Sequence, residues 1–519
     1  MADDRVVVVG AGIGGLASAI HLAAMGFGVT VVERNKQAGG KLRQISIAGE
    51  PIDCGPTVFT MRWVFDELFA LAGASLEDYL TLSPLHTLAR HAWSERERLD
   101  LFADAVRTRD AVAEFSGPEE ARGFSAFCAD AQKMYRTLKD PFLASPRPNP
   151  LTLANRIGLH RYADLFSIRP FETMWGALSH YFRDPRLRQL FGRYATYAGS
   201  SPFAAPATLM LIAHVEQAGV WRIEGGMQRL AVALEKLARA KGVAFCFGEE
   251  VHRIVIENRA AVGIALASGE RLDAGAVIVN ADAAALADGA FGDAAASAGK
   301  AVPEHDRSLS AVTWAMTAEM QGFDLLHHNV FFSHDYATEF HDIFRRRQLP
   351  RCPTVYICAQ DRHDGALRAG PERLMMLVNA PPIGDQRQFT PEEIAPCESQ
   401  VFKLLERCGL LVLARRASVT TPWDFHRLFP ATGGALYGRA THGWTAAFRR
   451  PTSKTNIRNL YLAGGSTHPG AGVPMAALSG RLAATRLVSD RASTRTSLRV
   501  GISGGISTAS ATTDALRSR

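Results

Sequence analysis

The sequence predicts an α/β protein in which a discontinuous, Rossmann-like nucleotide-binding domain with a parallel sheet is joined to a second, mixed α+β domain. Two glycine-rich turns near opposite ends of the chain lead to this prediction, together with long intervening stretches that carry no nucleotide signal. A chain of 519 residues is also too long for one simple core, so two closely connected domains are the natural expectation.

The first glycine-rich turn lies inside a strand–helix–strand unit. Residues 5–9 form an apolar run that is typical of a strand covered on both faces. The glycines of a GxGxxG pattern follow, residues 16–25 are rich in alanine and predicted to be helical, and a second strand over 29–32 ends at Glu33. A GxGxxG pattern alone is weak, but a strand, a helix and an acid in register with it predict a dinucleotide site.

Each residue of this unit has a physical task. Gly10 allows the tight turn, Gly12 lets the backbone approach a pyrophosphate, and Gly15 lets the helix pack closely on the strand. The first amides of the helix would hold the anion, and Glu33 would accept hydrogen bonds from an adenosine ribose. A merely tight strand-to-helix turn would not explain this acid.

The segment after Glu33 favours FAD over NAD as the dinucleotide. A glycine pair at 39–40 stands beside Lys41 and Arg43, and this basic stretch suits a long anionic cofactor that continues past its pyrophosphate. Gly55, in the stretch IDCGPTVF, provides another close approach of the backbone. An NAD enzyme does not need these additions, so FAD is the predicted cofactor.

The middle of the chain supplies a third part of the same domain. Residues 221–243 turn through two glycines into a helix, short alternating segments follow, and the strand AVIVNAD ends at Asp282. A strand that starts at Val251 could offer backbone groups to the adenine. The expected division is a nucleotide-binding domain of residues 1–85, 220–300 and 441–488, a substrate domain of residues 86–219 and 301–440, and a disordered Ser/Thr/Ala/Gly-rich tail of residues 489–519.

The composition predicts a cytoplasmic protein. Its seven cysteines are odd in number, scattered and never arranged as CxxC, which does not suit a disulfide framework. Residues 6–32 lack charged side chains, but glycines interrupt the run repeatedly. A buried strand–helix–strand unit explains this stretch better than a signal peptide or a membrane span.

Three stretches carry a family resemblance: LRQLFGRYATYAGSSPFAAPATLMLIAHVEQAGVWRIEGGM at 187–227, TGGALYGRATHGWTAAFRRP at 432–451 and GGSTHPGAGVPMAALSGR at 464–481. With these motifs the chain resembles the bacterial carotenoid desaturases of the phytoene desaturase family, which are FAD-dependent flavoproteins of the amine-oxidase superfamily. The resemblance covers nearly all of residues 5–488. It looks most like the branch of 1-hydroxycarotenoid 3,4-desaturases, or hydroxyneurosporene desaturases.

The resemblance implies that the two glycine-rich turns bind opposite ends of one FAD. The C-terminal turn would pack against the ribityl chain and the isoalloxazine, with Pro474 in the first turn of a helix whose amides face the flavin. Related flavoproteins place an acid in this turn; it is absent here, and Ser466 or Thr467 is expected to substitute. The predicted cofactor-binding residues are Gly10, Gly12, Gly14, Gly15, Glu33, Arg34, Gly40, Lys41, Arg43, Gly55, Pro56, Thr57, Val251, Gly464, Gly465, Pro474 and Met475.

The resemblance also implies flavin-dependent dehydrogenation of a lipophilic carotenoid. A hydride leaves an allylic carbon for flavin N5, a proton leaves the neighbouring carbon, and a new double bond joins the polyene. The conjugated chain delocalises positive charge, so a strong base is not required. The expected role of the protein is a long apolar tunnel that fixes the register of the substrate and excludes water. In this branch one end must also accept a tertiary hydroxyl, because an unmatched buried hydroxyl is costly.

The sequence assigns no catalytic residue. His442 and His468 lie in motifs close to the flavin and could handle a proton, but a hydrogen-bonded structural histidine is the commoner role. Arg169 could neutralise the reduced flavin or meet the substrate hydroxyl, and an arginine at the surface or at a domain interface is the alternative.

Two patterns imitate sites that we do not expect. HHNVFFSHD, with His327, His328 and His334, has a spacing that suits no common ligand pattern, so no metal is predicted. GISGG at 501–505 matches GxSxG, but a nucleophile elbow needs a strand, a turn and a helix, which this tail is not expected to form.

The charge of the chain bears on its partners. The net charge is +7, and the one compact basic cluster is Arg345, Arg346 and Arg347, with Arg351 nearby. Such a cluster is ordinarily a solvated face, and without aromatic platforms it does not predict nucleic-acid binding. Because the implied substrates dissolve only in lipid, we expect peripheral association with the inner membrane, with part of the second domain in the cytoplasmic leaflet and these arginines on anionic head groups.

Three other functions fit parts of the same sequence. A phytoene desaturase would act on a carotene without a hydroxyl, and a polyamine or porphyrinogen oxidase would share the FAD-binding frame but take a polar substrate. A non-catalytic escort protein on the same fold would have a decayed nucleotide site, against which the intact first glycine turn and Glu33 argue. The sequence names no electron acceptor.

Overall fold

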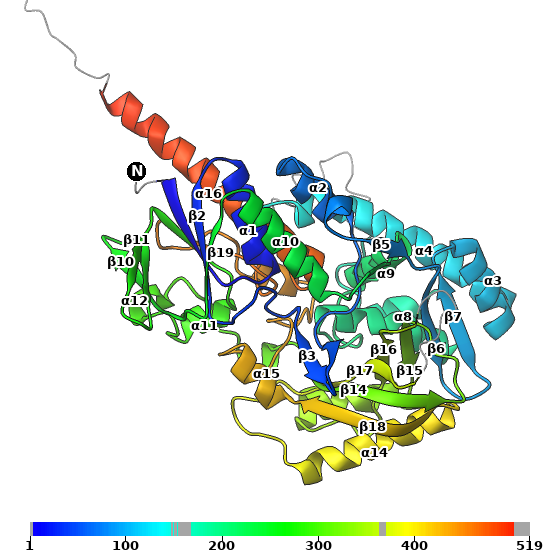
Figure 1. The fold of residues 1–519 in the computed structure, drawn as a ribbon. Coiled ribbons are helices and arrows are strands. Elements are labelled where there is room, and N and C mark those ends of the chain that lie inside the picture. Colours follow the sequence, from blue (N-terminus) through cyan, green and yellow to red (C-terminus); the bar gives the residue numbers. More distant parts are fainter. Residues whose placement is uncertain (1–3, 147–148, 150–152, 154–167, 363–369, 503–519) are drawn as a thin grey trace, which may run out of the picture.

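The computed structural model describes residues 4–146, 149, 153, 168–362 and 370–502 (Figure 1). Two large sheets organise these residues. The first is a five-stranded parallel sheet in the order β19 (Leu460–Leu462), β13 (Ala276–Val279), β1 (Arg5–Val9), β2 (Gly28–Glu33) and β9 (Ala244–Phe247). Its strands come from segments far apart in the sequence, so the predicted discontinuous parallel sheet is confirmed.

Helices cover one face of this sheet. Helix α1 (Ile13–Ala24) packs against both α10 (Gln228–Ala240) and α16 (Val473–Ile502), as Figure 1 shows. The three helices, together with α2 (Trp63–Leu71), bury their apolar sides in one core with the sheet. Helix α1 starts three residues earlier than the sequence predicted, because Ile13, Gly14 and Gly15 already have helical backbone, whereas Gly12 is the extended N-cap.

The other face of the parallel sheet carries a smaller sheet and two short helices. The smaller sheet is antiparallel. Its apolar side chains and those of the two helices pack against this face of the parallel sheet and form a second apolar core. Its strands and the accompanying helices are β10 (Val251–Glu257), β11 (Ala260–Leu266), β12 (Arg271–Asp273), α11 (Ala283–Ala287) and α12 (Asp293–Ala296).

The second large sheet is mixed. Its order is β18 (Leu411–Thr420), β14 (Ser310–Gln321), β17 (Glu372–Ala380), β16 (Val355–Ala359), β15 (His328–Phe331), β6 (Thr87–Ala92) and β7 (Arg98–Phe102). All neighbours are antiparallel except β15 and β6. This sheet and its helices confirm the predicted mixed α+β second part.

Helices cover both faces of the mixed sheet. Helix α14 (Pro391–Arg407) packs on one face through Val401, Leu404 and Leu405. The helices that share a core with the other face are α3 (Ala105–Ser116), α4 (Pro118–Leu138), α7 (Met174–Leu178), α8 (Pro185–Gly192), η5 (Arg193–Ala198), η6 (Ala207–Met210) and α9 (Leu211–Gln217).

Short elements connect the two large sheets. The hairpin of β3 (Gln44–Ile47) and β4 (Glu50–Asp53) belongs to the N-terminal segment but packs against β14 and β17 of the mixed sheet. The remaining regular elements are β5 (Leu82–Pro84), β8 (Trp221–Ile223), α13 (Tyr336–His341), α15 (Pro422–Leu428) and the single helical turns or π-helical segments η2 (Leu76–Asp78), η3 (Lys139–Leu143), η7 (Glu304–Asp306), η8 (Asp342–Arg346) and η9 (Ala446–Arg449). The domain boundaries stay a prediction.

Helix α16 reaches into the C-terminal tail, for which disorder over residues 489–519 stays a prediction. It continues past Val488 through Ile502. The segment contains no proline, and Arg486 pairs with Asp490 one turn later at 2.7 Å, which supports the helix. Residues 503–519, with the serine of the GxSxG pattern, lie outside the described residues.

The length and the apolar character of a helix decide whether it could cross a membrane. Within residues 4–146, 168–362 and 370–502, no helix combines the length and the apolar character needed to cross a bilayer.

Candidate functional site

A cavity of about 1000 Å³ lies between the parallel sheet and the mixed sheet. Both glycine-rich turns line it, through Gly10 and Gly12 on one side and Gly464 and Gly465 on the other. Every predicted cofactor-binding residue except Gly15 is part of its wall. Two segments more than four hundred residues apart therefore face one crevice, at the carboxyl ends of parallel strands where α/β sheets bind ligands.

Gly15 packs directly against the first glycine turn. A Cβ atom at this position would lie 2.0 Å from the carbonyl oxygen of Gly10, so only glycine lets the helix start this close to the turn. The turn itself requires the φ of +97° that Gly10 adopts.

Glu33 ends β2 with its carboxylate against the first turn. Its Oε2 accepts a hydrogen bond from the backbone N–H of Ala11 over 2.8 Å, and its Oε1 accepts one from the backbone N–H of Asn35 over 2.9 Å. Glu33 is 6% exposed and lines the cavity. Oε1 also accepts from Asn35 Nδ2 over 2.6 Å, so three of the roughly four acceptor positions of the carboxylate are used and one remains for a ribose hydroxyl.

Asn280 joins the two glycine turns, and sequence reasoning missed it. Its Nδ2 donates to the carbonyl oxygen of Gly10 over 3.4 Å. A Cβ atom on Gly464, whose φ is +111°, would lie 2.9 Å from Asn280 Oδ1. The signal was present: Asn280 directly follows β13, a parallel neighbour of β1, where polar ligand-binding residues are expected.

Buried cations line the middle of the cavity. Burial lowers the pKa of Lys41, whose Nζ donates to the carbonyl oxygen of Leu436 over 2.6 Å. Burial also lowers the pKa of Arg43, and it lowers that of Arg450, which sequence reasoning missed, to about 10. None of these three cations forms an ion pair with a described residue. Buried positive charge that no direct ion pair neutralises fits an anionic cofactor such as FAD.

An acid from the middle of the chain, Asp282 at the N-cap of α11, lies next to the C-terminal turn. Ser466 lines the cavity and its Oγ accepts from the backbone N–H of Ala283 over 3.1 Å, which places it beside Asp282. Asp282 also lines the cavity, and its Oδ1 caps α11 by accepting from Ala284 N–H over 3.0 Å. Thr467 instead donates to Gly464 O over 2.7 Å and does not face the cavity.

The two candidate histidines lie outside the cavity wall. Nε2 of His442 accepts from the backbone N–H of Ser201 over 3.0 Å, and Nε2 of His468 lies 2.9 Å from the carbonyl oxygen of Phe142. Burial lowers the pKa of each imidazole to about 4. Both imidazoles are therefore neutral and hydrogen-bonded to backbone groups. These contacts fit a structural histidine rather than a catalytic one.

Arg169 also lies outside the cavity wall. Its guanidinium pairs with Glu172 over 3.3 Å and packs over the ring of Tyr181. These contacts fit the alternative role, that of an arginine at the surface or at a domain interface.

A polar cluster that the sequence did not reveal stands in the wall of the mixed-sheet part. Arg193 Nη2 donates to Tyr197 Oη over 3.2 Å, and Tyr197 donates to Glu216 Oε1 over 2.9 Å. Arg193, Tyr197 and Glu216 all line the cavity. Nearby, Tyr356 Oη lies 2.7 Å from Thr57 Oγ1. Polar groups thus meet in a wall that is otherwise mostly apolar.

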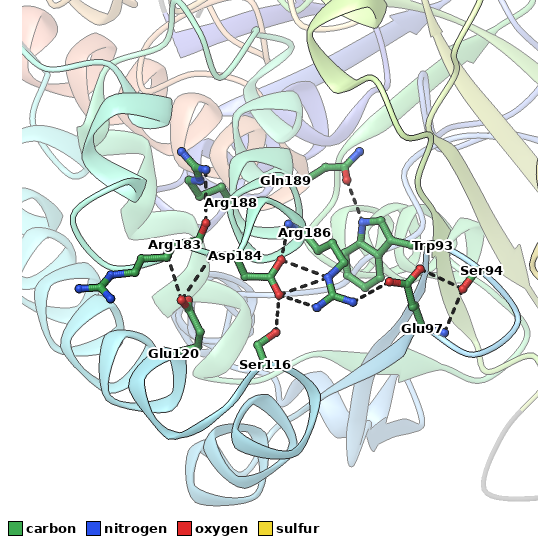
Figure 2. Close-up of polar contacts among 10 residues, drawn as sticks. All are labelled: Trp93, Ser94, Glu97, Ser116, Glu120, Arg183, Asp184, Arg186, Arg188 and Gln189. Atoms are coloured by element: carbon green, nitrogen blue, oxygen red, sulfur yellow. Dashed lines mark hydrogen bonds and ion pairs between the residues drawn. The ribbon is translucent and has the colours of Figure 1, made fainter.

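Helix α8 holds this cluster in position, because it runs directly into η5 and Arg193. Asp184 caps α8 by accepting from the backbone N–H of Arg186 over 2.8 Å, and it also accepts from Ser116 Oγ over 2.6 Å. The guanidinium of Arg186 bridges Asp184 and Glu97, with 2.7 Å to Glu97, as Figure 2 shows. Ordering α8 in this way orders the residues that follow it.

The histidine-rich segment forms a different group from the one that its spacing suggested. Ligand atoms of His327, His328 and Cys358 lie within 4.8 Å of one another, whereas His334 is not part of the group. His328 Nδ1 lies 2.7 Å from the hydroxyl of Tyr356, and burial raises the pKa of the Cys358 thiol, which disfavours the thiolate that binds metals. The expected absence of a metal stays a prediction.

The basic cluster is largely paired within the protein. Arg346 and Arg351 both pair with the buried carboxylate of Asp342, at 3.2 and 3.0 Å, and Arg347 pairs with Glu304 at 2.5 Å. These pairs reduce the positive charge that the cluster can offer to anionic lipid.

The fold and the cavity define a dinucleotide-binding flavoprotein: a Rossmann-like sheet, two glycine turns at one crevice, an acid at the end of β2 and buried cations between them. The sequence matches the family described as flavin containing amine oxidoreductase over residues 13–314 and 375–488, so the chain belongs to that family. It is an FAD oxidoreductase, and its relatives confirm the resemblance to carotenoid desaturases.

Three of these relatives span almost the whole chain. The chain is 53% identical to hydroxyneurosporene desaturase from Rubrivivax gelatinosus over 98% of both chains. It is 45% identical to hydroxyneurosporene desaturase from Cereibacter sphaeroides over 94% of this chain and 98% of that one. It is 30% identical to 4,4'-diapolycopene oxygenase from Methylomonas sp. over 94% of this chain and 99% of that one.

Solved structures share the fold at low identity. An oxidoreductase from Methanosarcina mazei is similar with a TM-score of 0.55 and 18% identity, over 92% of this chain and 99% of that one. Putrescine oxidase bound to putrescine is similar with a TM-score of 0.58 and 14% identity, over 93% of this chain and 99% of that one. These likenesses concern the fold alone.

Proposed function

We propose that the chain is an FAD-dependent carotenoid desaturase that introduces the C3–C4 double bond of a 1-hydroxycarotenoid such as 1-hydroxyneurosporene. The observation that carries the proposal is 53% identity to a hydroxyneurosporene desaturase over 98% of both chains. The mostly apolar cavity that the glycine turns line supports it, because a polyene needs an apolar channel. FAD, when bound, supplies the hydride acceptor.

The residues of the cavity have distinct proposed tasks. Gly10, Gly12 and the N-terminus of α1 bind the pyrophosphate, and Glu33 binds the adenosine ribose. Asp282, beside Ser466, takes the place of the missing acid and binds the ribityl chain. Arg450 lies where the C-terminal turn is expected to meet the isoalloxazine, so its charge favours the reduced, anionic form.

Apolar walls exclude water and hold the polyene in register. The side chains of Val330, Met375 and Leu377 face the cavity from the mixed sheet, and Leu209 and Ile212 face it from η6 and α9. A rigid polyene that is held on both sides presents one bond to the cofactor, which lowers the barrier by positioning.

We also propose that the cavity opens toward a membrane surface. Phe171 and Trp444 are 77% and 45% exposed, their rings lie 5.3 Å apart, and both line the cavity, so they mark a place where it reaches the protein surface. An exposed aromatic pair at an apolar opening suits the interface of a bilayer, from which a lipophilic substrate enters.

The proposed function is tested with purified, FAD-loaded protein and 1-hydroxyneurosporene in lipid vesicles. Desaturation extends the conjugated system, so we expect the absorption maximum of the carotenoid to move to longer wavelength. Phytoene is offered separately as the substrate of the nearest alternative enzyme. A shift with phytoene alone would contradict the proposal in favour of a phytoene desaturase, and no shift with either would remove carotenoid desaturation altogether.

Membrane association is tested by co-sedimentation with vesicles of anionic phospholipid. We expect the double variant Phe171→Ala and Trp444→Ala to bind several-fold more weakly than the parent protein, because each aromatic side chain contributes buried apolar area. Met25→Ala removes an apolar side chain that is 49% exposed at the C-cap of α1 and serves as the control. Equal binding by the parent and the double variant would refute this surface.

A further inference from the structure

The wall that residues 86–219 and 301–440 contribute to the cavity carries two charged side chains among the described residues, Arg193 and Glu216. They are only 8% and 3% exposed. A buried charge pair is expensive, and apolar residues of similar volume often stabilise a protein equally well. Stability alone therefore does not account for this pair, and its place in the wall of a substrate channel points to recognition.

Tyr197 stands between the two charges and faces the cavity. It accepts from Arg193 and donates to Glu216, so its hydroxyl group has a fixed direction. Tyr194 donates to the other carboxylate oxygen of Glu216 and does not line the cavity. Tyr194 thus binds the carboxylate on the side away from the cavity. Tyr197 binds it on the cavity side, where its own oxygen is fixed in position to accept a hydrogen bond from a ligand.

Arg193 has more donors than acceptors. Its hydrogen bond to Tyr197 is the one that its guanidinium makes within the described part of the chain, and its Nε–H finds no acceptor there. A guanidinium carries five N–H donors, and leaving such donors unmatched in a buried site is costly. A hydroxyl group fits this arrangement, because its oxygen accepts from Arg193 and its hydrogen is donated to Tyr197.

The cluster borders the part of the wall that is expected to contact the flavin. Tyr356 lies 2.7 Å from Thr57, in the Gly55–Thr57 turn, and is within electrostatic reach of both Arg193 and Tyr197. In the proposed reaction the C3–C4 bond begins two carbon–carbon bonds from the carbon that carries the hydroxyl. A hydroxyl site must therefore lie beside the flavin rather than at the far end of the channel, and this cluster meets that condition.

We propose that Arg193 and Tyr197, held in place by Glu216, bind the hydroxyl group of the substrate and so make the chain prefer a hydroxylated polyene to the matching carotene. The inference rests on the proposed function and names the residues that set its specificity. The same contact fixes the substrate along the channel, so that C3 and C4 lie against the flavin.

The test compares hydroxyneurosporene with neurosporene, the matched carotene without the hydroxyl, on FAD-loaded protein. We expect the parent protein to have the higher kcat/KM with hydroxyneurosporene. We expect Tyr197→Phe to lower the ratio of the two kcat/KM values by about tenfold or more, because a site built to bind a hydroxyl discriminates strongly while its polar groups are paired. A general loss of folded or FAD-loaded protein lowers both kcat/KM values by the same factor and leaves their ratio unchanged.

Tyr194→Phe is the matched control. It removes the same hydroxyl group and a hydrogen bond to the same carboxylate, but from the side of Glu216 that does not face the cavity. We expect it to lower the melting temperature and to leave the ratio unchanged.

Several outcomes would overturn the inference. Tyr197→Phe could lower both kcat/KM values alike, or Tyr194→Phe could change the ratio equally, and either result would make the cluster structural. A shifted flavin reduction potential in Arg193→Gln with an unchanged ratio would assign the cluster to the cofactor. A parent protein that converts both carotenoids equally well would refute this inference but leave desaturation intact, whereas conversion of neither would refute both.

Discussion

At the scale of single residues, the burial of His442 and His468 predicts how the stability of the protein depends on pH. Burial lowers the pKa of each to about 4 in the folded protein, whereas the unfolded chain has the ordinary value near 6.5. Between these values the unfolded state binds more protons, so the free energy of unfolding falls as the pH drops from about 6.5 to about 4. Each histidine contributes up to about 3 kcal/mol to this loss.

The measurement is urea unfolding at several pH values. His442→Gln keeps an acceptor for the Ser201 amide but does not titrate, so we expect a shallower loss of stability below pH 6.5. His305→Gln, at an exposed position, is the control and should follow the parent protein. Parallel curves for His442→Gln and the parent would show that His442 is charged in the folded state.

At the scale of elements, the N-terminus of α8 gives the clearest prediction. Asp184 caps α8 and also binds Ser116 and Arg186, whereas Asp104 caps α3 by accepting from the backbone N–H of Val106 over 2.8 Å at an exposed position. We expect Asp184→Ala to lower the free energy of unfolding by about 2–4 kcal/mol and Asp104→Ala by only about 1 kcal/mol. Equal losses in urea unfolding would mean that the network of Figure 2 adds nothing to the cap.

Elements also show what the sequence could predict. The strand at 5–9, its glycine turn and Glu33 are set by local rules, so their order and spacing predicted both the unit and its ligand. Local rules are less decisive for the C-terminal tail, because its Ser/Thr/Ala-rich composition suggests disorder while the absence of proline lets α16 continue to Ile502.

The polar cluster could not be predicted, because no local pattern joins its members. Arg193 and Tyr197 lie in one irregular helical turn, Glu216 comes from α9, and the neighbouring Tyr356 comes from the mixed sheet. Only tertiary packing turns these scattered residues into one site. Asn280 is an intermediate case, since its place after a parallel strand was a usable signal.

At the scale of the whole molecule, the cavity joins segments that lie far apart in the sequence. The cavity wall combines Gly10 and Glu33 from the first unit, Asp282 from the middle and Gly464 from the C-terminal turn. A ligand that binds all of these only in the folded state stabilises the complete fold by mass action, by about 2.7 kcal/mol when its concentration is a hundred times its Kd. FAD should therefore act on the unfolding of the protein as a unit.

Removal of FAD tests this coupling. We expect the deflavinated protein to unfold at a lower temperature in calorimetry and added FAD to restore the original melting temperature. Glu33→Ala removes the ribose acceptor and should reduce the rise that a given FAD concentration produces, whatever it does to the protein without FAD. Glu257→Ala, which loses only a surface pair with Arg271, should keep the full rise. If FAD raised the melting temperatures of the parent and Glu33→Ala equally, Glu33 would not bind the cofactor, and the N-terminal unit would hold it through the glycine turn alone.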